Sequence, residues 1–316
     1  MSGKRIFMTG ASGYIGSRVT TLALAQGHTV HGLVRSDASA SKLKSLGATP
    51  IHGNVSTDHA VLTREAAAAD VVIHLADTLT NDFNQPYEKV LETEYKVLDA
   101  FFAALKGTEK PLITTSGSLV AAEEPDNKET DETTPYRENV HIQRHLGEKY
   151  ALEQGEKHGV RVCVIRLPGF VYGLGASGMG MFANVFSGAG EAVYVADNAE
   201  GELANVYVDD AARMYLLAIE KGRAGQAYNC TNATYVAHRD WVEAMGKTLG
   251  VPVRGVSAEE AREKAGFLSL FLVVKNRATS TKARRELGWE TEGVGLIEDL
   301  TSGSYAELAK TLKSKK

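Results

Sequence analysis

Cysteine is scarce in this chain of 316 residues, which contains only Cys163 and Cys230. The two lie far apart, and neither belongs to a CxxC pair or a Cys/His spacing, so the pattern excludes a disulfide framework and a zinc site. The nine histidines are equally scattered, and we predict no metal site.

Long hydrophobic runs are also missing. No segment approaches the roughly 18 to 20 consecutive apolar residues that a membrane span requires. The first residues, MSGKRIFMTG, pass straight into a short strand-like run, without the apolar stretch and cleavage site of a secretory signal. These features predict a cytoplasmic protein that does not bind membranes.

Positive charge is not in excess. Lys and Arg number 35 against 39 Asp and Glu, and the longest basic run is the terminal KSKK, which excludes nucleic acid as a partner. With 43% hydrophobic and 23% charged residues, the composition is that of an ordinary globular protein. The length allows one large domain or two.

Short apolar runs alternate with longer helical patterns through the first half of the chain. The runs, which indicate buried parallel strands, are 5–10, 29–35, 49–54, 70–77, 111–117 and 160–169. Helices are predicted after the first run to about residue 26, over 87–105 and over 135–158, the last with Thr134 as N-cap and Pro135 at its first position. This alternation predicts an α/β fold with a Rossmann-type, doubly wound parallel sheet.

The pattern changes after residue 173. Residues 174–190, LGASGMGMFANVFSGAG, suggest a mobile connection or a surface loop. We predict a dinucleotide-binding domain from 1–173 and 205–224, and a smaller C-terminal α/β substrate region from 174–204 and 225–316.

A glycine-rich loop follows the first predicted strand. Its sequence, TGASGYIG at 9–16, places three glycines at three-residue spacing directly before an amphipathic helix. The first glycine permits a tight turn, the second lets the backbone approach a pyrophosphate, and the third allows close packing of helix on strand. The predicted cofactor contacts here are Gly10, Ser12, Gly13, Tyr14, Ile15 and Gly16.

The end of the second strand indicates which dinucleotide is bound. NAD enzymes usually carry an acidic residue about 20 residues past the loop, but this chain has Val34 and then Arg35. A guanidinium suits a 2′-phosphate, and Ser36 can add a hydrogen bond, so NADP(H) is predicted. The alternative is that Arg35 simply projects into water from a strand end.

At this point the chain resembles the extended-type short-chain dehydrogenase/reductase superfamily, which includes NAD-dependent epimerase/dehydratases and 3β-hydroxysteroid dehydrogenase-like proteins. The resemblance rests on TGASGYIG at 9–16, GNV at 53–55, HLA at 74–76, TTSGSLV at 114–120, RLPGFVYG at 166–173, NVYVDDAA at 205–212 and TKARRELGW at 281–289. It implies further cofactor contacts at Asn54, Val55, Leu75, Ala76, Thr114, Pro168, Gly169 and Val171. Asn54 faces the adenine in this pattern, and the 168–171 stretch approaches the nicotinamide.

The resemblance also implies a catalytic Ser after the fifth strand and a Tyr-x-x-x-Lys pair on the next helix. Ser116 matches the serine. Counting back from 159–166 places Val140 at the tyrosine position, Arg144 at the lysine position and Glu148 at a following acidic position. The chain therefore resembles an atypical subgroup that lacks the Tyr/Lys pair.

Other side chains can compensate for the missing tyrosine. On a helix spanning 135–158, Tyr136 and Arg144 fall within about 40° of Val140, with His141 on the flank beyond Arg144. Tyr136 or His141 is therefore a candidate proton donor. A rival register pairs His145 with Lys149.

The substrate side is expected to be apolar. The predicted contributors are Met179, Met181, Phe182, Phe267, Leu270 and Phe271, although 267–274 equally fits a buried helix or strand. Asp209 and Asp210 are assigned a structural role at a helix N-terminus. The apolar face of the 87–105 helix is either core or part of a homodimer contact.

The leading hypothesis is an NADP(H)-dependent oxidoreductase that acts on a small hydrophobic or aromatic carbonyl or alcohol compound. The alternatives are a non-redox NADP(H)-binding sensor or scaffold, and an isomerase, dehydratase or cyclase on the same fold.

Overall fold

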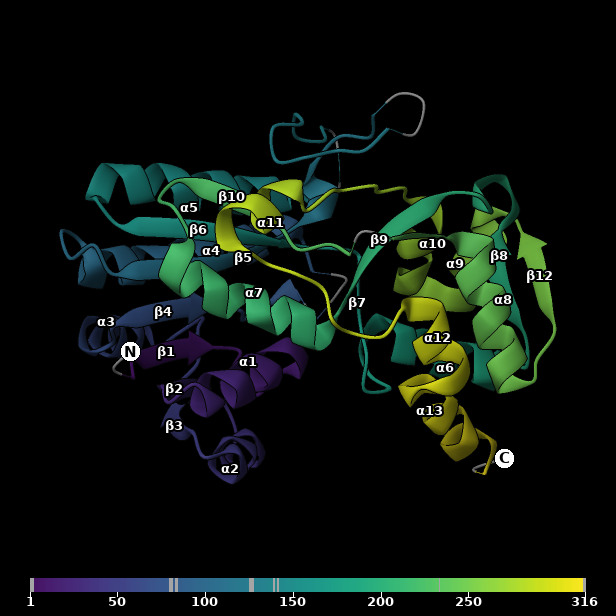
Figure 1. Ribbon diagram of the computed structural model, residues 1–316, viewed down its shortest axis with the longest axis horizontal. Coiled ribbons are helices and arrows are strands. Elements are labelled where there is room, and N and C mark those ends of the chain that lie inside the picture. The colour runs from purple at the N-terminus through teal and green to yellow at the C-terminus, as the bar shows by residue number, and fades with distance from the viewer. Residues whose placement is uncertain are drawn as a thin grey trace.

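A computed structural model describes residues 3–79, 82, 85–124, 128–138, 140, 142–232 and 234–314. Within this part, seven parallel strands form one sheet in the order β10-β6-β5-β4-β1-β2-β3 (Figure 1). The strands are β1 (Arg5–Thr9), β2 (Thr29–Val34), β3 (Thr49–His52), β4 (Val71–His74), β5 (Pro111–Gly117), β6 (Arg161–Leu167) and β10 (Gln226–Asn229). The predicted doubly wound fold is confirmed, with β10 as a seventh strand that the sequence pattern did not indicate.

Helices cover both faces of the sheet. They are α1 (Tyr14–Ala25), α2 (Asp37–Leu46) and α7 (Val208–Lys221) on one face, and α3 (His59–Ala68), α4 (Tyr87–Leu105) and α5 (Arg144–His158) on the other. Strand residues alternate between the two cores: Ile6 and Met8 pack with α1 and α7, whereas Phe7 packs with α3 and α4. A strand covered on both faces must be apolar throughout, which explains the continuous apolar runs.

The apolar face of α4 belongs to the core. Leu98, Phe102 and Leu105 are at most 3% exposed and pack against α3, α5 and the sheet. Tyr95, on the same helix, stacks on Tyr150 of α5 with ring centroids 4.4 Å apart. Intramolecular packing therefore accounts for the apolar spacing of this helix.

Helix α5 is shorter than predicted. It begins at Arg144 rather than Pro135, because residues 135–137 are extended and pair with the segment after β5. Ala122 N–H donates to the Pro135 carbonyl at 2.8 Å, and Arg137 N–H donates to the Val120 carbonyl at 2.7 Å. The predicted N-cap at Thr134 was wrong, and Tyr136 does not share a helix face with Arg144.

The C-terminal region forms a second lobe beside the sheet (Figure 1). Its elements are β7 (Phe170–Tyr172), α6 (Ser177–Ala189), β8 (Ala192–Val195), β9 (Glu202–Tyr207), β11 (Tyr235–Ala237), α8 (His238–Leu249), β12 (Val253–Val256), α9 (Ala258–Ala265), α10 (Leu270–Val273), α12 (Leu296–Ser302) and α13 (Ser304–Lys313). Two small sheets, β11-β9-β7 and β12-β8, pack with these helices around Trp241. In the described part of the chain, no helix is long and apolar enough to cross a membrane.

Two expectations about this region need correction. Most of the Gly-rich stretch 174–190 is helix α6 rather than a loop: Met179, Phe182 and Phe186 recur at helical spacing and are buried. The small residues between them obscured this period. In addition, the predicted division placed all of 225–316 in the substrate region. In the structure, β10 and α11 (Thr281–Leu287) pack on the main sheet and α7, so part of 225–316 belongs to the first lobe.

The stretch 267–274 is neither a strand nor a fully buried helix. It forms a short 3-10 turn followed by α10, in which Leu272 is buried while Leu270 and Val273 are 43% and 41% exposed. Phe271 packs against Phe170 of β7, with ring centroids 6.2 Å apart. Part of this run therefore lines the junction between the lobes.

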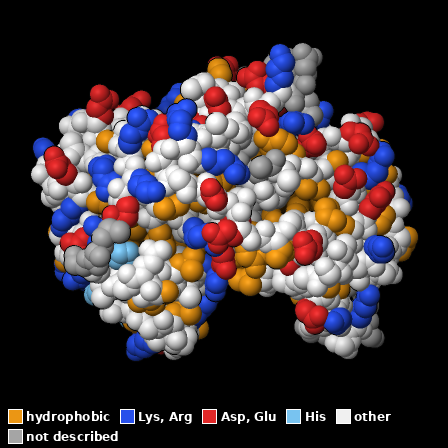
Figure 2. Space-filling view, viewed as in Figure 1, with side chains coloured by type: hydrophobic (Ala, Val, Ile, Leu, Met, Phe, Trp, Pro, Cys, Tyr) orange, Lys and Arg blue, Asp and Glu red, His pale blue; other side chains and the backbone are white. Residues whose placement is uncertain are grey.

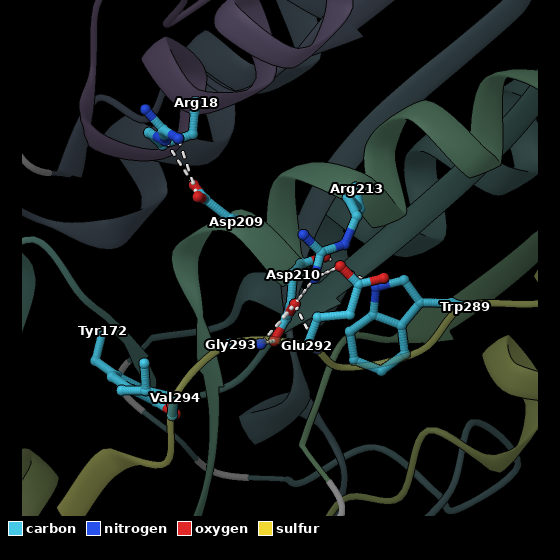
Figure 3. Close-up of polar contacts among 9 residues, drawn as sticks. All are labelled: Arg18, Tyr172, Asp209, Asp210, Arg213, Trp289, Glu292, Gly293 and Val294. Carbon is cyan, nitrogen blue, oxygen red and sulfur yellow. Dashed lines mark hydrogen bonds and ion pairs between the residues drawn. The ribbon is translucent and has the colours of Figure 1, made fainter. Parts of the chain in front are cut away.

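Two aspartates at the start of α7 join the layers (Figure 3). Asp209 pairs with Arg18 of α1. Asp210 is 1% exposed and accepts hydrogen bonds from the backbone N–H groups of Glu292 (3.0 Å) and Gly293 (3.1 Å). It also pairs with Arg213. Asp210 thus holds the segment that leads from α11 into the second lobe, and the side chain has a structural role.

Candidate nucleotide and substrate site

The glycine loop lies at the carboxyl end of β1, in the centre of the sheet where the strand order reverses. Gly10 has φ +72°, and a Cβ atom there would lie 2.9 Å from the backbone nitrogen of Ala76. A Cβ on Gly16 would lie 2.1 Å from the carbonyl oxygen of Gly10. Both positions therefore require glycine, one for conformation and one for close helix–strand contact.

The loop leaves the N-terminus of α1 open. Gly13 is the N-cap and is exposed, no side chain caps the helix, and its first turn, which includes Tyr14 and Ile15, contains no acidic residue. The first N–H groups of a helix lack intrahelical partners and carry partial positive charge. This arrangement suits a phosphate group, as the motif predicts.

Positive charge gathers beside the loop. Arg35 is exposed and directly follows β2, and Ser36 is the N-cap of α2, accepting from Ser39 N–H at 3.3 Å. Lys42 of α2 donates to the Ser12 carbonyl at 2.7 Å, so its ammonium lies against the glycine loop. The sequence analysis missed Lys42, whose position depends on how α2 packs against the loop.

The other predicted adenosine contacts lie at the same edge of the sheet. Asn54 and Val55 follow β3, and the Asn54 side chain accepts from Ser56 N–H at 3.0 Å. Leu75 and Ala76 follow β4, and both of their N–H groups donate to the Thr9 hydroxyl, at 3.3 and 3.2 Å. The end of β4 is thereby fixed to the start of the glycine loop.

Ser116 and Arg144 both lie at the carboxyl end of β5. Ser116 is 4% exposed, near the end of β5 and one strand along from β4, and Thr114 lies two residues earlier and is also buried. The Cδ atom of Arg144 lies 3.6 Å from where a Cβ on Gly117 would be, next to Ser116. The Ser116 hydroxyl is buried and has no hydrogen-bond partner among the described residues.

The guanidinium of Arg144 forms an ion pair with Asp77, three residues beyond β4. Burial raises the pKa of the Asp77 carboxyl, but the facing Arg144 charge and its hydrogen bond outweigh burial, and the pKa lies below its ordinary value. The position that the family resemblance assigns to lysine thus supplies a fixed positive charge between β4 and β5.

Tyr136 is committed to a different contact. Its hydroxyl donates to Glu148 at 3.0 Å, and Glu148 in turn accepts from Arg166 at 2.6 Å. The side chains of Glu148 and Arg166 are 0% and 3% exposed, so this is a buried ion pair. Burial, followed by the Glu148 charge, raises the pKa of Tyr136 to about 12.

The remaining α5 candidates differ in how far the structure places them. His141 and its neighbour Asn139 lie outside the described residues, whereas Val140 is described and is not helical. His145 stacks on Tyr136 with ring centroids 5.4 Å apart, and the Lys149 ammonium lies 4.8 Å from the same ring. The His145–Lys149 pair therefore faces Tyr136, while Arg144 faces Asp77 and Gly117.

Tyr87, the first residue of α4, is a further phenol near Arg144 that the sequence analysis missed. It is 5% exposed and belongs to an apolar cluster with Leu79 and Ile142. Burial raises its pKa to about 12, and the nearby Arg144 charge opposes that rise. The described residues give its hydroxyl no hydrogen-bond partner. No local pattern marks this residue, because α4 and α5 meet only in the folded chain.

The predicted nicotinamide stretch runs along the junction between the lobes. Pro168 is buried and Val171 is half-buried on β7. A Cβ on Gly169 would lie 3.7 to 3.8 Å from three apolar side chains, which come from the segment after β5, from α10 and from β9: Leu119, Phe271 and Leu203. Figure 2 shows the surface hollowed between the two lobes, with hydrophobic side chains gathered beside the hollow.

The predicted substrate-side residues are not all at this junction. Met179 and Phe182 are 0% exposed in the core of the second lobe. Met181 is 45% exposed on the outer face of α6. Phe271 is the predicted residue that lies against Gly169, and its ring meets that of Phe267 edge to face at 6.1 Å.

Comparison with known proteins agrees with this geometry. The family model described as "NAD dependent epimerase/dehydratase family" matches residues 6–231. The chain belongs to the NAD-dependent epimerase/dehydratase family. This confirms the predicted membership of the extended short-chain dehydrogenase/reductase group, and with it an enzyme of oxidoreductase or epimerase/dehydratase type that uses NAD or NADP.

Individual relatives cover nearly the whole chain. An uncharacterized protein of Schizosaccharomyces pombe is 37% identical over 95% of this chain and 99% of its own. A 4-hydroxy-2-methyl-3-oxo-4-farnesyl-3,4-dihydroquinoline-1-oxide ketoreductase of Stigmatella aurantiaca is 26% identical over 90% of this chain and 91% of its own. The structure of UDP-glucose 4-epimerase from Thermotoga maritima matches with a TM-score of 0.77 at 22% identity, covering 98% and 99% of the two chains, and so shares the fold.

Proposed function

We propose that this protein is an NADP(H)-dependent oxidoreductase that interconverts a small hydrophobic or aromatic carbonyl compound and its alcohol. The observation that carries the proposal is the open glycine loop with Arg35 on one side and Lys42 against Ser12. The two cations suit a 2′-phosphate, whereas NAD enzymes present a carboxylate to the ribose.

The apolar junction supports a hydrophobic substrate. The three side chains nearest to Gly169 offer flat and branched apolar surface. The ketoreductase of Stigmatella aurantiaca acts on a ring ketone that bears a farnesyl chain, which is consistent with this chemistry.

The chain's own residues can support reduction of a carbonyl. When bound, NADPH supplies the hydride. The Ser116 hydroxyl is buried with a donor that no described residue uses, and it can donate to the substrate oxygen. Arg144, paired with Asp77, supplies the cation at the end of β5. The proton for the product alcohol comes from Tyr87, from His141 or from water, because the Tyr136 hydroxyl already donates to Glu148.

Cofactor preference is tested with Arg35→Ala and Lys42→Ala. Each substitution should weaken NADPH binding about tenfold or more, because each removes a cation from the 2′-phosphate. Arg35→Ala should leave NADH binding unchanged, whereas Lys42→Ala also loses its hydrogen bond to the Ser12 carbonyl and should weaken NADH binding less than NADPH binding. Isothermal titration calorimetry measures both affinities. Lys44→Ala, on the same helix, is the matched control. Equal losses for both cofactors would contradict the assignment.

The role of Ser116 is tested by Ser116→Ala. NADPH oxidation against a panel of aromatic and aliphatic ketones should fall about 100-fold or more, with NADPH affinity nearly unchanged, because the serine contacts the reacting oxygen only. Ser118→Ala is a suitable control, since that hydroxyl bonds to Asn276 at 2.6 Å. Unchanged turnover in Ser116→Ala would remove the serine from the mechanism.

A non-redox role that uses NADP(H) as a ligand is the second candidate. The Ser116 hydroxyl is covered, and Tyr136 is held by Glu148. The predicted register also leaves the family's tyrosine position to Val140. Tight NADPH binding with no turnover of any ketone in the panel would favour this candidate over the reductase.

A further inference from the structure

Gly173 is held from both lobes at once. It follows β7 and has φ +123°, which glycine adopts far more readily than other residues. Its carbonyl accepts from the hydroxyl of Tyr14 at 2.9 Å, and Tyr14 is the first residue of α1. Its N–H donates to the hydroxyl of Tyr305 at 2.9 Å, and Tyr305 lies on α13. One residue, through its two flanking peptide groups, therefore links the helix behind the glycine loop to the last helix of the chain.

Tyr305 makes further contacts with the same segment. Its hydroxyl donates to the Ala176 carbonyl at 2.8 Å, and the adjacent Ser304 hydroxyl accepts from Gly175 N–H at 2.8 Å. Tyr305 is 2% exposed, so these bonds form in a water-poor environment, where an unmade bond is costly. The first turn of α13 therefore fixes the path of 173–177.

The conformation of this segment needs such support. Leu174 and Ser177 have φ values of +57° and +68°, in the left-handed region that residues with a side chain rarely adopt. Leu174 is 50% exposed, so its side-chain packing provides little compensation. Unfavourable backbone conformations of this kind persist where surrounding contacts impose them. Here the contacts come from Tyr14 and α13.

The segment 173–177 connects the predicted cofactor site to the second lobe. It joins β7, which carries the predicted nicotinamide contacts, to α6 of the second lobe. At its other contact, Tyr14 is in the turn of α1 whose N–H groups face the cofactor pyrophosphate. We propose that Tyr305 is a positioning residue for the cofactor site, acting through Gly173 on Tyr14, so that dinucleotide binding and the placement of the second lobe are coupled.

The proposal rests on the proposed use of NADPH, and a double-mutant cycle tests it. Tyr14→Phe, Tyr305→Phe and the double variant each keep the ring and remove only hydroxyl groups. Each single variant should weaken NADPH binding about three- to tenfold, and the double variant should bind no more weakly than the worse single, because one break already uncouples the lobes. Tyr235→Phe, which loses a hydroxyl bonded to Glu129 at 2.9 Å in the same lobe, should leave the affinity unchanged.

Hydrogen exchange provides a second readout, which is taken on variants whose circular dichroism matches that of the wild-type protein. In the wild-type protein, NADPH should slow exchange of the amides of 304–306, which lie on α13 of the second lobe and are bonded to 173–177. Tyr14→Phe should lose this remote protection while keeping protection of the glycine loop. A tyrosine that serves only stability would lower the melting temperature without changing the transmitted protection.

The outcomes separate the two proposals. The coupling alone is overturned if the wild-type protein binds NADPH but the losses of affinity multiply in the double variant. It is also overturned if NADPH gives the wild-type protein no remote protection. Wild-type protein that does not bind NADPH overturns the proposed cofactor and the coupling together. Losses that do not multiply, with remote protection that depends on the Tyr14 hydroxyl, support the coupling.

Discussion

Removal of the Asp210 carboxylate should destabilise the whole chain rather than one lobe. Its two oxygens accept from the backbone N–H groups of Glu292 and Gly293 and pair with Arg213, at a position that is 1% exposed (Figure 3). In Asp210→Ala these partners lose their acceptor, and water replaces it poorly in a buried site. The crossing segment also contributes the Trp289 indole, which donates to the Asp210 carbonyl at 2.8 Å.

The expected magnitude follows from the groups left unpaired. Two hydrogen bonds to a charged acceptor, at about 1.5 kcal/mol each, give a loss of about 3 kcal/mol in the free energy of unfolding. Arg213 adds little to this loss, because it is 28% exposed and keeps its ion pair with Glu292. Urea denaturation followed by circular dichroism measures this loss. The sequence neighbour Asp209 is the control, because its pair with Arg18 is a quarter exposed and should be worth only about 0.5 to 1 kcal/mol.

The urea midpoints of Asp210→Ala and Asp209→Ala show whether the Asp210 carboxylate holds the crossing segment. Asp210→Ala should shift the urea midpoint several times further than Asp209→Ala. If both variants lie within about 1 kcal/mol of the wild-type protein, the carboxylate does not hold the crossing segment, and the physical reasoning above is refuted.

Three further changes have defined outcomes. Glu148→Ala should cost about 3 to 5 kcal/mol in urea denaturation because it leaves Arg166 buried without a counter-charge; a loss below about 1 kcal/mol would show that the pair is dispensable. The pKa of Asp77 is lower in the folded than in the unfolded state, so its contribution to stability is present above about pH 4 and is lost as the pH falls through the folded pKa. The difference in urea midpoint between the wild-type protein and Asp77→Asn should therefore shrink at pH 3. A constant difference would contradict the pairing with Arg144. Gly293→Ala would place a Cβ 2.4 Å from the side chain of Tyr207, so the melting temperature of this variant should fall by several degrees. An unchanged melting temperature would show that the segment can shift freely.

Local sequence was sufficient for the glycine loop. The glycine spacing at 10, 13 and 16 acts through a strand, a turn and a helix that are contiguous in the chain, so its geometry follows from the sequence alone. The same holds for the alternation of strands and helices that gave the parallel sheet. By contrast, Lys42 reaches the loop because α2 packs beside it, which no local pattern encodes.

The catalytic half depends on contacts between distant segments. Thr134 and Pro135 are typical of a helix start, but residues 135–137 pair with 120–122 instead, so the tertiary pairing overrides the local preference. Tyr136 consequently meets Glu148 rather than the substrate side. Tyr87 and Asp77 surround Arg144 from α4 and from the end of β4, and their convergence could not be predicted from spacing.

The most direct test of the account is a side-by-side calorimetric titration of the wild-type protein with NADPH and NADH. The arrangement of the glycine loop, Arg35 and Lys42 predicts that NADPH binds at least about tenfold more tightly than NADH. Equal affinities, or tighter binding of NADH, would contradict the assignment of the 2′-phosphate site, and absence of binding by both would contradict the cofactor site itself.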